Sequence, residues 1–277
     1  MFALADCNNF FVSCERVFRP DLENKPVIVL SNNDGWAIAR SNEAKALGIK
    51  MGDPLFKIRS LVQQHNITIF SGNMPLYADF SQRVRAVLRD HAPHIEVYSI
   101  DEAFLDLRGM EHNDLDAFAK TLSHECRRLT GIPVSVGVAP TKTLAKIASK
   151  LCKQYPKLRG GCFMYRPQDI EKVLRKYPIE EVWGIGRRHA PRLKEMGIAT
   201  AYDFRSLTEE WVRKRMGITG VRTWLELHGT PCIEFSHEQA DKQSIMVSRS
   251  FSTELYDIDE LHETITTFAG IAAEKLR

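Results

Sequence analysis

The residues best suited to do chemistry in this chain are three carboxylates, Asp6, Asp101 and Glu102. Asp6 ends a short apolar run that is typical of a strand, and the other two lie between two further strand-like runs. Clustered carboxylates repel one another and raise each other's pKa unless a cation is present. Their oxygens suit Mg²⁺, and two such ions about 3.5–4 Å apart can clamp the attacking and leaving oxygens of a phosphoryl transfer.

These acids also have a simpler interpretation, in which Asp6 caps a strand and Asp101 and Glu102 are ordinary turn residues. Adjacent residues of a regular strand face opposite ways, so Asp101 and Glu102 converge only if the turn twists one of them round. Asp106, on the strand that follows, is interpreted as structural. The choice between the two interpretations depends on the elements that position the acids.

Those elements form a mixed α+β pattern over the first two thirds of the chain. Outside a long insertion at about residues 11–72, the expected order is strand 2–5, helix 76–91, strands 95–99 and 103–107, helix 115–129, strand 134–138 and helix 141–153. A β-α-β-β-α-β order is that of a ferredoxin-like unit, which would bring the three carboxylates to one edge of its sheet. The other expected elements are strands 26–30 and 67–70, short helices from about 168 to 230, a strand at 244–251 and a helix at 259–277.

A glycine turn in the helical part of the chain is the second candidate site. Gly184 and Gly186 leave backbone N–H groups exposed that can hydrogen-bond a DNA phosphate, and Arg187 and Arg188 add positive charge. The pattern resembles a helix-hairpin-helix DNA-binding motif, although a plain glycine-rich connection between helices has the same look. It is not a dinucleotide fingerprint, because no third glycine follows at the right step and no strand precedes it.

Charge is unevenly distributed along the chain. There are 38 Lys and Arg against 35 Asp and Glu, a net charge of +3, which is too small to indicate a nucleic-acid partner. Residues 127–159, however, hold eight basic residues and no acid, whereas residues 235–277 carry a net charge of −4. A basic middle fits a polyanion partner through release of counterions, and it fits a solvated helix face equally well.

Composition excludes several classes of protein. The 277 residues are 44% hydrophobic and 26% charged, which is ordinary for folded chains and leaves room for about two or three compact units. No window approaches eighteen apolar residues, and no basic region precedes Asp6, so neither a membrane span nor a secretory signal is expected. The six cysteines form no Cys-x-x-Cys pair, which indicates free thiols in a reducing cytoplasm.

Several short motifs together carry a resemblance to a known family. They are Asp6-Cys7-Asn8-Asn9-Phe10-Phe11, Lys25-Pro26-Val27, Glu43-Ala44-Lys45-Ala46-Leu47-Gly48, Tyr98-Ser99-Ile100-Asp101-Glu102-Ala103-Phe104, Val136-Gly137-Val138, Lys142-Thr143-Leu144-Ala145-Lys146 and Gly184-Ile185-Gly186. In order and spacing they resemble the motifs of Y-family translesion DNA polymerases. Three further runs make the chain most similar to the UmuC branch, the catalytic subunits of DNA polymerase V: Phe18-Arg19-Pro20-Asp21-Leu22, Ser31-Asn32-Asn33-Asp34-Gly35 and Ser248-Arg249-Ser250-Phe251.

The resemblance implies a four-part organisation and an activity. It implies a palm at 1–10 and 72–164, fingers at 11–71, a thumb with the helix-hairpin-helix at 165–234, and the start of a little finger at 244–277. The little finger is expected to be incomplete, as in a C-terminally truncated chain. The implied reaction is template-directed transfer of dNMP from a dNTP to a primer 3′-hydroxyl, error-prone and past damaged template bases, in the SOS response.

The resemblance also implies roles for individual residues at the carboxylates. Asp6, Asp101 and Glu102 would hold two Mg²⁺ ions and act as the catalytic residues. The backbone carbonyl of Cys7 would be a further metal ligand.

Nucleotide-binding roles follow from the same resemblance. Phe11 matches the steric gate that clashes with a ribose 2′-hydroxyl, and Phe10 beside it belongs to the same nucleotide site. Lys45 and Lys153 match positions that bind the triphosphate, a task suited to point-charge lysines. Asn42 stands where other branches often have Tyr, so a Tyr hydroxyl contact to phosphate is not expected.

The partners implied by the resemblance are primed DNA and dNTP, a UmuD′ dimer, RecA with ATP, and a sliding clamp, with no membrane. The C-terminal tail through which the family meets the clamp is expected to be missing. Two other functions compete with polymerase activity. A nucleotidyl cyclase shares the βαββαβ core but needs no helix-hairpin-helix, and a non-catalytic DNA-binding remnant needs no carboxylates.

Overall fold

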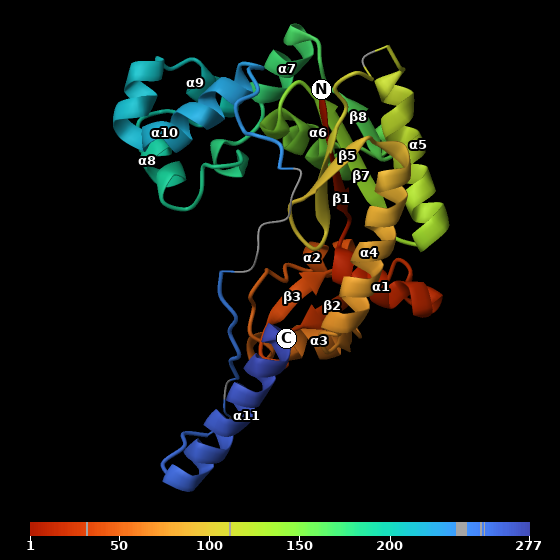
Figure 1. Ribbon diagram of the computed structural model, residues 1–277, viewed down its shortest axis with the longest axis vertical. Coiled ribbons are helices and arrows are strands. Elements are labelled where there is room, and N and C mark those ends of the chain that lie inside the picture. Colours follow the sequence, from red (N-terminus) through yellow and green to blue (C-terminus); the bar gives the residue numbers. More distant parts are fainter. Residues whose placement is uncertain (32, 111, 237–242, 250, 252) are drawn as a thin grey trace. The chain divides into compact units, whose positions relative to one another are not determined.

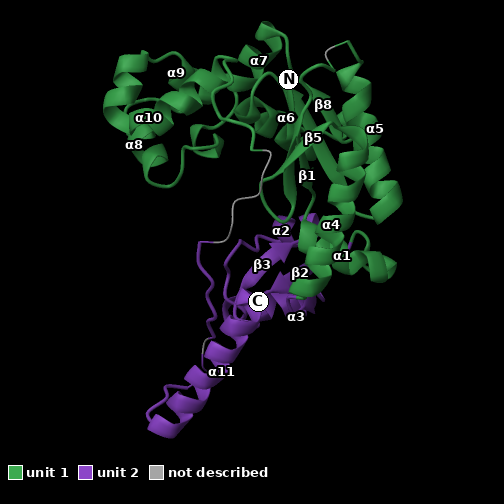
Figure 2. Cartoon of the chain, in the orientation of Figure 1, with its two compact units in different colours: residues 1–24, 73–237 green, residues 25–72, 238–277 purple. Residues whose placement is uncertain are grey.

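The computed structural model describes residues 1–31, 33–110, 112–236, 243–249, 251 and 253–277. The chain divides into two compact units, shown in different colours in Figure 2. Unit 1 comprises residues 1–24 and 73–237, and unit 2 comprises residues 25–72 and 238–277. The three carboxylates all lie in unit 1.

Unit 1 is built on a five-stranded sheet with the strand order β5-β6-β1-β7-β8. The strands are β1 (Phe2–Cys7), β5 (His94–Val97), β6 (Glu102–Asp106), β7 (Val134–Ala139) and β8 (Gly161–Phe163). β1 runs antiparallel to both β6 and β7, and β7 runs parallel to β8. Without β8, this is the strand order of a ferredoxin-like unit, so the predicted fold class is confirmed.

Helices cover both faces of this sheet (Figure 1). The sheet helices are α4 (Met74–His91), α5 (Leu115–Thr130) and α6 (Lys142–Gln154). Two glycines on neighbouring strands let α5 and α6 approach from opposite sides. A Cβ at Gly137 would lie 2.1 Å from the Ser149 backbone nitrogen of α6, and one at Gly161 would lie 2.5 Å from the Lys120 nitrogen of α5. The tight packing of α6 fixes the lysines that it carries toward the carboxylates.

The helical segment after the sheet shares its core with the sheet. It comprises α7 (Pro167–Leu174), η3 (Ile179–Glu181), α8 (His189–Glu195), α9 (Ala201–Arg205) and α10 (Glu209–Leu227), with α10 kinked at Gly217. One buried apolar cluster runs from Leu4 and Phe104 of the sheet to Phe204 and Leu227 of these helices. The fully buried carboxylate of Glu226 also accepts a 2.9 Å hydrogen bond from the Thr143 N–H in the first turn of α6.

Two short helical elements of unit 1 lie after α1 and between α6 and β8. They are η1 (Pro20–Leu22) and η2 (Pro156–Leu158). Helix α1 (Phe10–Phe18) packs on α4 within unit 1. The division by compactness therefore places α1 with the sheet, whereas the predicted fingers begin at residue 11.

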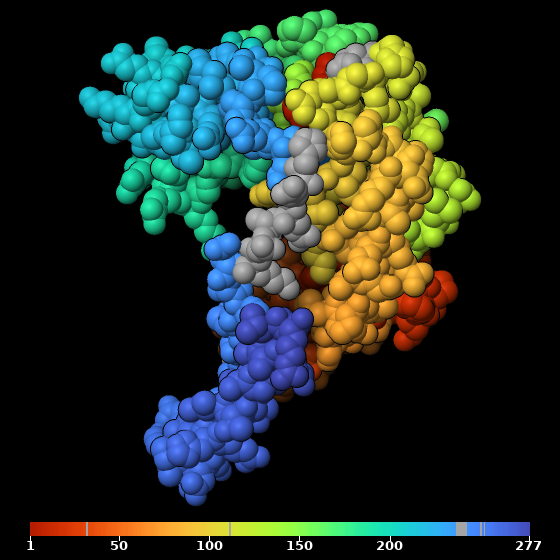
Figure 3. All heavy atoms as spheres, in the orientation of Figure 1, coloured from red at the N-terminus to blue at the C-terminus, as the bar shows by residue number. Residues whose placement is uncertain are grey.

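Unit 2 contains a three-stranded sheet with the order β3-β2-β4. Its elements are β2 (Val27–Leu30), β3 (Ala37–Arg40), α2 (Asn42–Ala46), α3 (Leu55–Gln64), β4 (Thr68–Phe70) and α11 (Ile258–Leu276). Ile28, Leu30, Ile49 and Ile58 form its core. All residues of α11 are described and none is buried. Its atoms are the dark blue spheres in Figure 3.

The strand predicted at 244–251 is wrong for the residues that the structure describes. Residues 243–249 and 251 form no strand or helix there, and Ser250 lies outside the described residues. A β-branched run makes a strand only where a neighbouring strand accepts its hydrogen bonds.

Across the described ranges, no helix is long and apolar enough to cross a membrane.

Candidate active site

The sheet register brings the predicted carboxylates to one end of β1 and β6. Asp6 is the direct cross-strand partner of Glu102, and Asp101 immediately precedes Glu102 in the turn from β5. The Cys7 N–H donates a 2.9 Å hydrogen bond to the carbonyl of Asp101, which ties the turn to the end of β1. Three residues from two distant parts of the chain therefore share one site.

Ser99 explains how two adjacent acids can serve the same site. Its hydroxyl donates to a carboxylate oxygen of Asp101 at 2.6 Å and accepts from the Glu102 N–H at 3.0 Å. The side chain thus closes the turn from inside and fixes the carboxylate of Asp101. Ser99 belongs to a motif that carries the family resemblance, but the sequence alone indicated no role for it.

Two lysines of α6 meet the carboxylates that face this helix. The Nζ of Lys153 lies 2.6 Å from Oδ1 of Asp6, and the Nζ of Lys146 lies 2.9 Å from both carboxylate oxygens of Glu102. The two lysines are seven residues apart, or about two helical turns, so they occupy one face of α6. Lys153 was predicted to bind a triphosphate, and here it neutralises Asp6.

The electrostatics of Asp6 indicate a place for a cation. The pKa of Asp6 is raised to about 6: burial is the largest cause, Lys153 opposes it, and the charges of Glu102 and Asp101 add smaller increases. As the side chains are positioned, no three His, Cys, Asp or Glu within the described residues could hold a metal ion together. Two of the three predicted carboxylate ligands, Asp6 and Glu102, are paired with lysines instead. Three acids at the same end of β1 and β6 nevertheless form a donor set that fits a hard divalent cation.

Lys146 sits among aromatic rings that sequence analysis did not associate with the site. Its Nζ lies 4.5 Å from the ring centre of Tyr98, 5.5 Å from that of Trp183 and 5.9 Å from that of Phe104. Trp183 also donates from Nε1 to the Tyr98 hydroxyl at 3.1 Å. These rings hold the ammonium by cation–π attraction and connect the glycine turn after Trp183 to Glu102.

The side chain of Cys7 lies on the opposite face of the sheet from that of its neighbour Asp6. Burial, followed by the charges of Asp6 and Asp101, raises the pKa of its thiol well above its ordinary value. The side chain therefore stays a neutral thiol, and the predicted metal contact concerns only its carbonyl oxygen.

The predicted nucleotide residues fall in both units. Phe10 is buried, whereas Phe11 is partly exposed and stacks on Tyr77 with ring centres 4.4 Å apart. Tyr77 was not predicted, because nothing in the spacing of α4 distinguishes it from a core residue. Lys45 is exposed on α2 of unit 2, on the same helix as Asn42.

The predicted DNA-binding turn joins η3 to α8. Gly184 has a φ of 89°, and a Cβ there would lie 2.5 Å from the Thr223 hydroxyl of α10, so this position requires glycine. A Cβ at Gly186 would meet no described atom within 4 Å. Arg187 and Arg188 are exposed beside it. The turn thus has an open backbone with two exposed cations next to it.

Comparisons with known proteins give a consistent result. Residues 5–150 match the impB/mucB/samB family. The whole chain is 46% identical to Protein ImpB of Salmonella typhimurium and 43% identical to Protein UmuC of Salmonella typhimurium strain LT2. It is 29% identical, over 98% of its length, to DNA polymerase IV of Bacillus velezensis. The chain spans 66% of the length of the ImpB and UmuC relatives and 65% of the DNA polymerase IV relative.

Solved structures resemble the chain in the same way. A Dbh ternary complex superimposes with a TM-score of 0.68 and 33% sequence identity, covering 82% of this chain and 66% of that one. DinB from Sulfolobus solfataricus gives a TM-score of 0.69 and 31% identity over the same shares of the two chains.

Proposed function

The chain belongs to the impB/mucB/samB family, which confirms the resemblance carried by its motifs, and we propose that it is an error-prone translesion DNA polymerase subunit of the UmuC kind. The observation that carries the proposal is the register that sets Asp6 opposite Glu102, with Asp101 in the adjoining turn. The names of a DNA polymerase IV relative and of a ternary-complex neighbour support the same activity.

The proposed reaction is attack of a primer 3′-hydroxyl on the α-phosphate of an incoming dNTP, with release of pyrophosphate. Asp6, Asp101 and Glu102 would hold two Mg²⁺ ions, with the Cys7 carbonyl as a further ligand. When bound, Mg²⁺ supplies positive charge at the transferring phosphate. Ser99 keeps the carboxylate of Asp101 in place through its 2.6 Å hydrogen bond.

The substrate contacts follow from the positions of the other residues. Lys153 stands beside Asp6 with a third of its side chain exposed, so its ammonium can exchange between Asp6 and a triphosphate. Lys45 would contribute a second cation to the triphosphate. Phe11, stiffened by its stack on Tyr77, would act as the steric gate, with Phe10 packed behind it.

The wider assignment is proposed on the same basis. The Gly184–Gly186 turn, with Arg187 and Arg188, would hold the DNA backbone. The palm, fingers, thumb and little finger would be residues 1–10 with 72–164, 11–71, 165–234 and 244–277. The partners would be primed DNA, dNTP, a UmuD′ dimer, RecA with ATP and a sliding clamp, in the cytoplasm.

Primer extension past an abasic site tests the proposal. The chain would be assayed with Mg²⁺, dNTPs, UmuD′ and RecA–ATP beside an Asp101→Ala/Glu102→Ala double variant. Incorporation by the wild type and not by the variant is expected. Failure of both, with the partners active on a full-length UmuC, would refute it. Equal binding of primed DNA by both inactive proteins would then assign the chain as a DNA-binding remnant.

A further inference from the structure

We propose that Ser81 and Arg85 of α4 are positioning residues, which hold the turn bearing Asp101 and Glu102 in the geometry that the reaction requires. The inference rests on the proposed function, because it concerns the same carboxylates. Neither residue belongs to a motif that the sequence analysis singled out.

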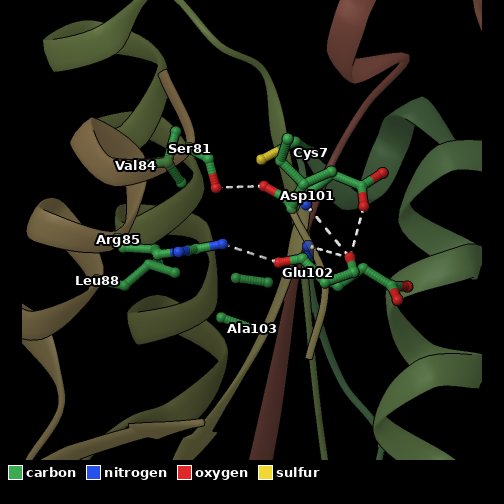
Figure 4. Close-up of a pocket in the computed structure, with 11 residues that line it drawn as sticks. Cys7, Ser81, Val84, Arg85, Leu88, Asp101, Glu102 and Ala103 are labelled. Carbon is green, nitrogen blue, oxygen red and sulfur yellow. Dashed lines mark hydrogen bonds between the residues drawn. The ribbon is translucent and has the colours of Figure 1, made fainter. Parts of the chain in front are cut away.

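The backbone of the turn is held at consecutive carbonyl oxygens. Three successive carbonyls, those of Ser99, Ile100 and Asp101, each accept a hydrogen bond from a different donor outside the turn. Arg85 donates from Nη2 to Ser99 at 3.1 Å, and the Ser81 hydroxyl donates to Ile100 (Figure 4). The third donor is the backbone N–H at the end of β1, at 2.9 Å. Two of the three supports are therefore side chains of a single helix.

The spacing of Ser81 and Arg85 along α4 lets both side chains reach the turn. Ser81 and Arg85 are four residues apart, so they lie one above the other on one face of α4. Val84 and Leu88 of the same face are buried beside them and line the same small pocket beneath the turn. A helix face that packs by apolar contacts thus presents two donors to two consecutive carbonyls.

Burial of Ser81 and the positive charge of Arg85 make the loss of either hydrogen bond costly in free energy. Ser81 is 3% exposed, so loss of its hydroxyl leaves the Ile100 carbonyl without a partner in a place that admits little water. Arg85 is partly buried, and burial lowers the pKa of its guanidinium, with the charge of Arg89 acting the same way. A guanidinium remains charged even so, and charge-assisted hydrogen bonds are about twice as strong as neutral ones.

The consequence reaches the carboxylates through the backbone. Groups that orient metal ligands by hydrogen bonds typically change metal affinity or activity by about 10–100-fold when they are removed. For Ser81→Ala and Arg85→Met we expect a rise of about tenfold in the metal concentration for half-maximal activity. A role limited to core stability would lower the melting temperature and leave this midpoint unchanged.

A matched control is available on α5. The Ser123 hydroxyl donates to the Val134 carbonyl at 2.6 Å, the same kind of helix-to-strand bond within unit 1 but on β7, which β1 separates from the turn. Ser123→Ala should lower stability by a similar amount and leave the metal midpoint unchanged. Arg85→Lys keeps a cationic donor and should recover part of the loss.

Three measurements on the full chain test the proposal. Hydrogen exchange of the segment 98–104 reports the turn, the free-ion EPR signal of Mn²⁺ reports metal affinity without DNA, and primer extension reports the Mg²⁺ midpoint. We expect faster exchange, weaker Mn²⁺ binding and a higher midpoint in Ser81→Ala and Arg85→Met than in Ser123→Ala. Unchanged exchange, or a midpoint equal to that of the control in an active protein, would overturn the inference.

The outcomes separate this inference from the proposed function. If the wild type extends no primer, the proposed function fails, and the exchange and Mn²⁺ results still decide whether Ser81 and Arg85 position the acids. If the wild type binds no Mn²⁺ and extends no primer, both proposals fall together.

Discussion

Asp6→Asn should make the metal-free protein more stable at neutral pH. The pKa of Asp6 is raised from 3.8 to about 6, mainly by burial. A shift of roughly two units corresponds to about 3 kcal/mol at 1.36 kcal/mol per unit. Asn imitates the neutral acid, but it leaves Lys153 without its 2.6 Å partner. We therefore expect a gain of about 1–3 kcal/mol at pH 7 and above.

The direction of the pKa shift sets the sign of the stability difference between the wild type and Asp6→Asn. The folded state binds the Asp6 proton more tightly than the unfolded chain does. Ionisation of Asp6 therefore lowers the stability of the wild type relative to that of Asp6→Asn as the pH rises from about 4 to about 6. The two proteins should be equally stable near pH 4 and differ most above about pH 6.5. Urea unfolding followed by circular dichroism at several pH values would measure the difference.

Asp106 supplies a control of opposite sign. It is buried on β6, and although burial works the other way, hydrogen bonds from Arg108 lower the pKa of this carboxyl. Asp106→Asn should therefore destabilise the protein above about pH 4. A pH-independent difference between the wild type and Asp6→Asn, or an Asp6→Asn protein less stable than the wild type at pH 8, would refute the reasoning. Added Mg²⁺ should raise the melting temperature of the wild type and not that of Asp6→Asn.

Three further changes test other parts of the structure. Gly137→Ala places a Cβ 2.1 Å from a backbone nitrogen of α6, so the melting temperature should fall by more than about 4 °C in a calorimetric scan. Glu226→Gln weakens the bond to Thr143 and should lower the unfolding free energy by about 1–2 kcal/mol in urea, whereas an unchanged value would show that the docking of α10 on α6 does not depend on this bond. Phe11→Ala removes the ring that stacks on Tyr77, so the ratio of ribonucleotide to deoxyribonucleotide incorporation should rise at least about tenfold in single-nucleotide assays. An unchanged ratio would exclude Phe11 as the gate.

The sheet helices and most of the described strands could be predicted from the sequence, but β3, β8 and the ten-residue helix α3 could not. The helix expected at 76–91 is α4, which starts two residues earlier because Asn73 caps it by accepting from the Leu76 N–H at 3.2 Å. β3 and β8 were missed although β2 and β4, which are equally short, were predicted. Ala and Gly, which are depleted in strands, weaken the pattern of β3 and β8, whereas β2 and β4 are rich in β-branched residues. The wrong strand at 244–251 shows the converse, since a suitable pattern without a pairing strand gives no ladder.

The acids of the site could be predicted, but their partners could not. Asp6, Asp101 and Glu102 follow from strand ends and a ferredoxin-like order, which together dictate which residues meet. The partner of Lys146 could not be predicted. Helix periodicity shows which residues lie on the same face of the helix as Lys146, but it does not show which carboxylate that face contacts. The contact with Glu102 depends on how closely α6 approaches the sheet, which Gly137 permits.

Helices α4 and α6 contact different atoms of the candidate active site. α4 contacts backbone oxygens, through Ser81 and Arg85, whereas α6 contacts carboxylate oxygens, through Lys146 and Lys153. Backbone carbonyls held by buried donors cannot move without breaking those bonds, but a lysine can leave a carboxylate by rotating about its own side chain. Exchange of an ammonium for a metal ion at Asp6 or Glu102 therefore needs side-chain rotation alone. The turn should keep its hydrogen-exchange protection when Mn²⁺ is added, and loss of that protection would show that the backbone moves as well.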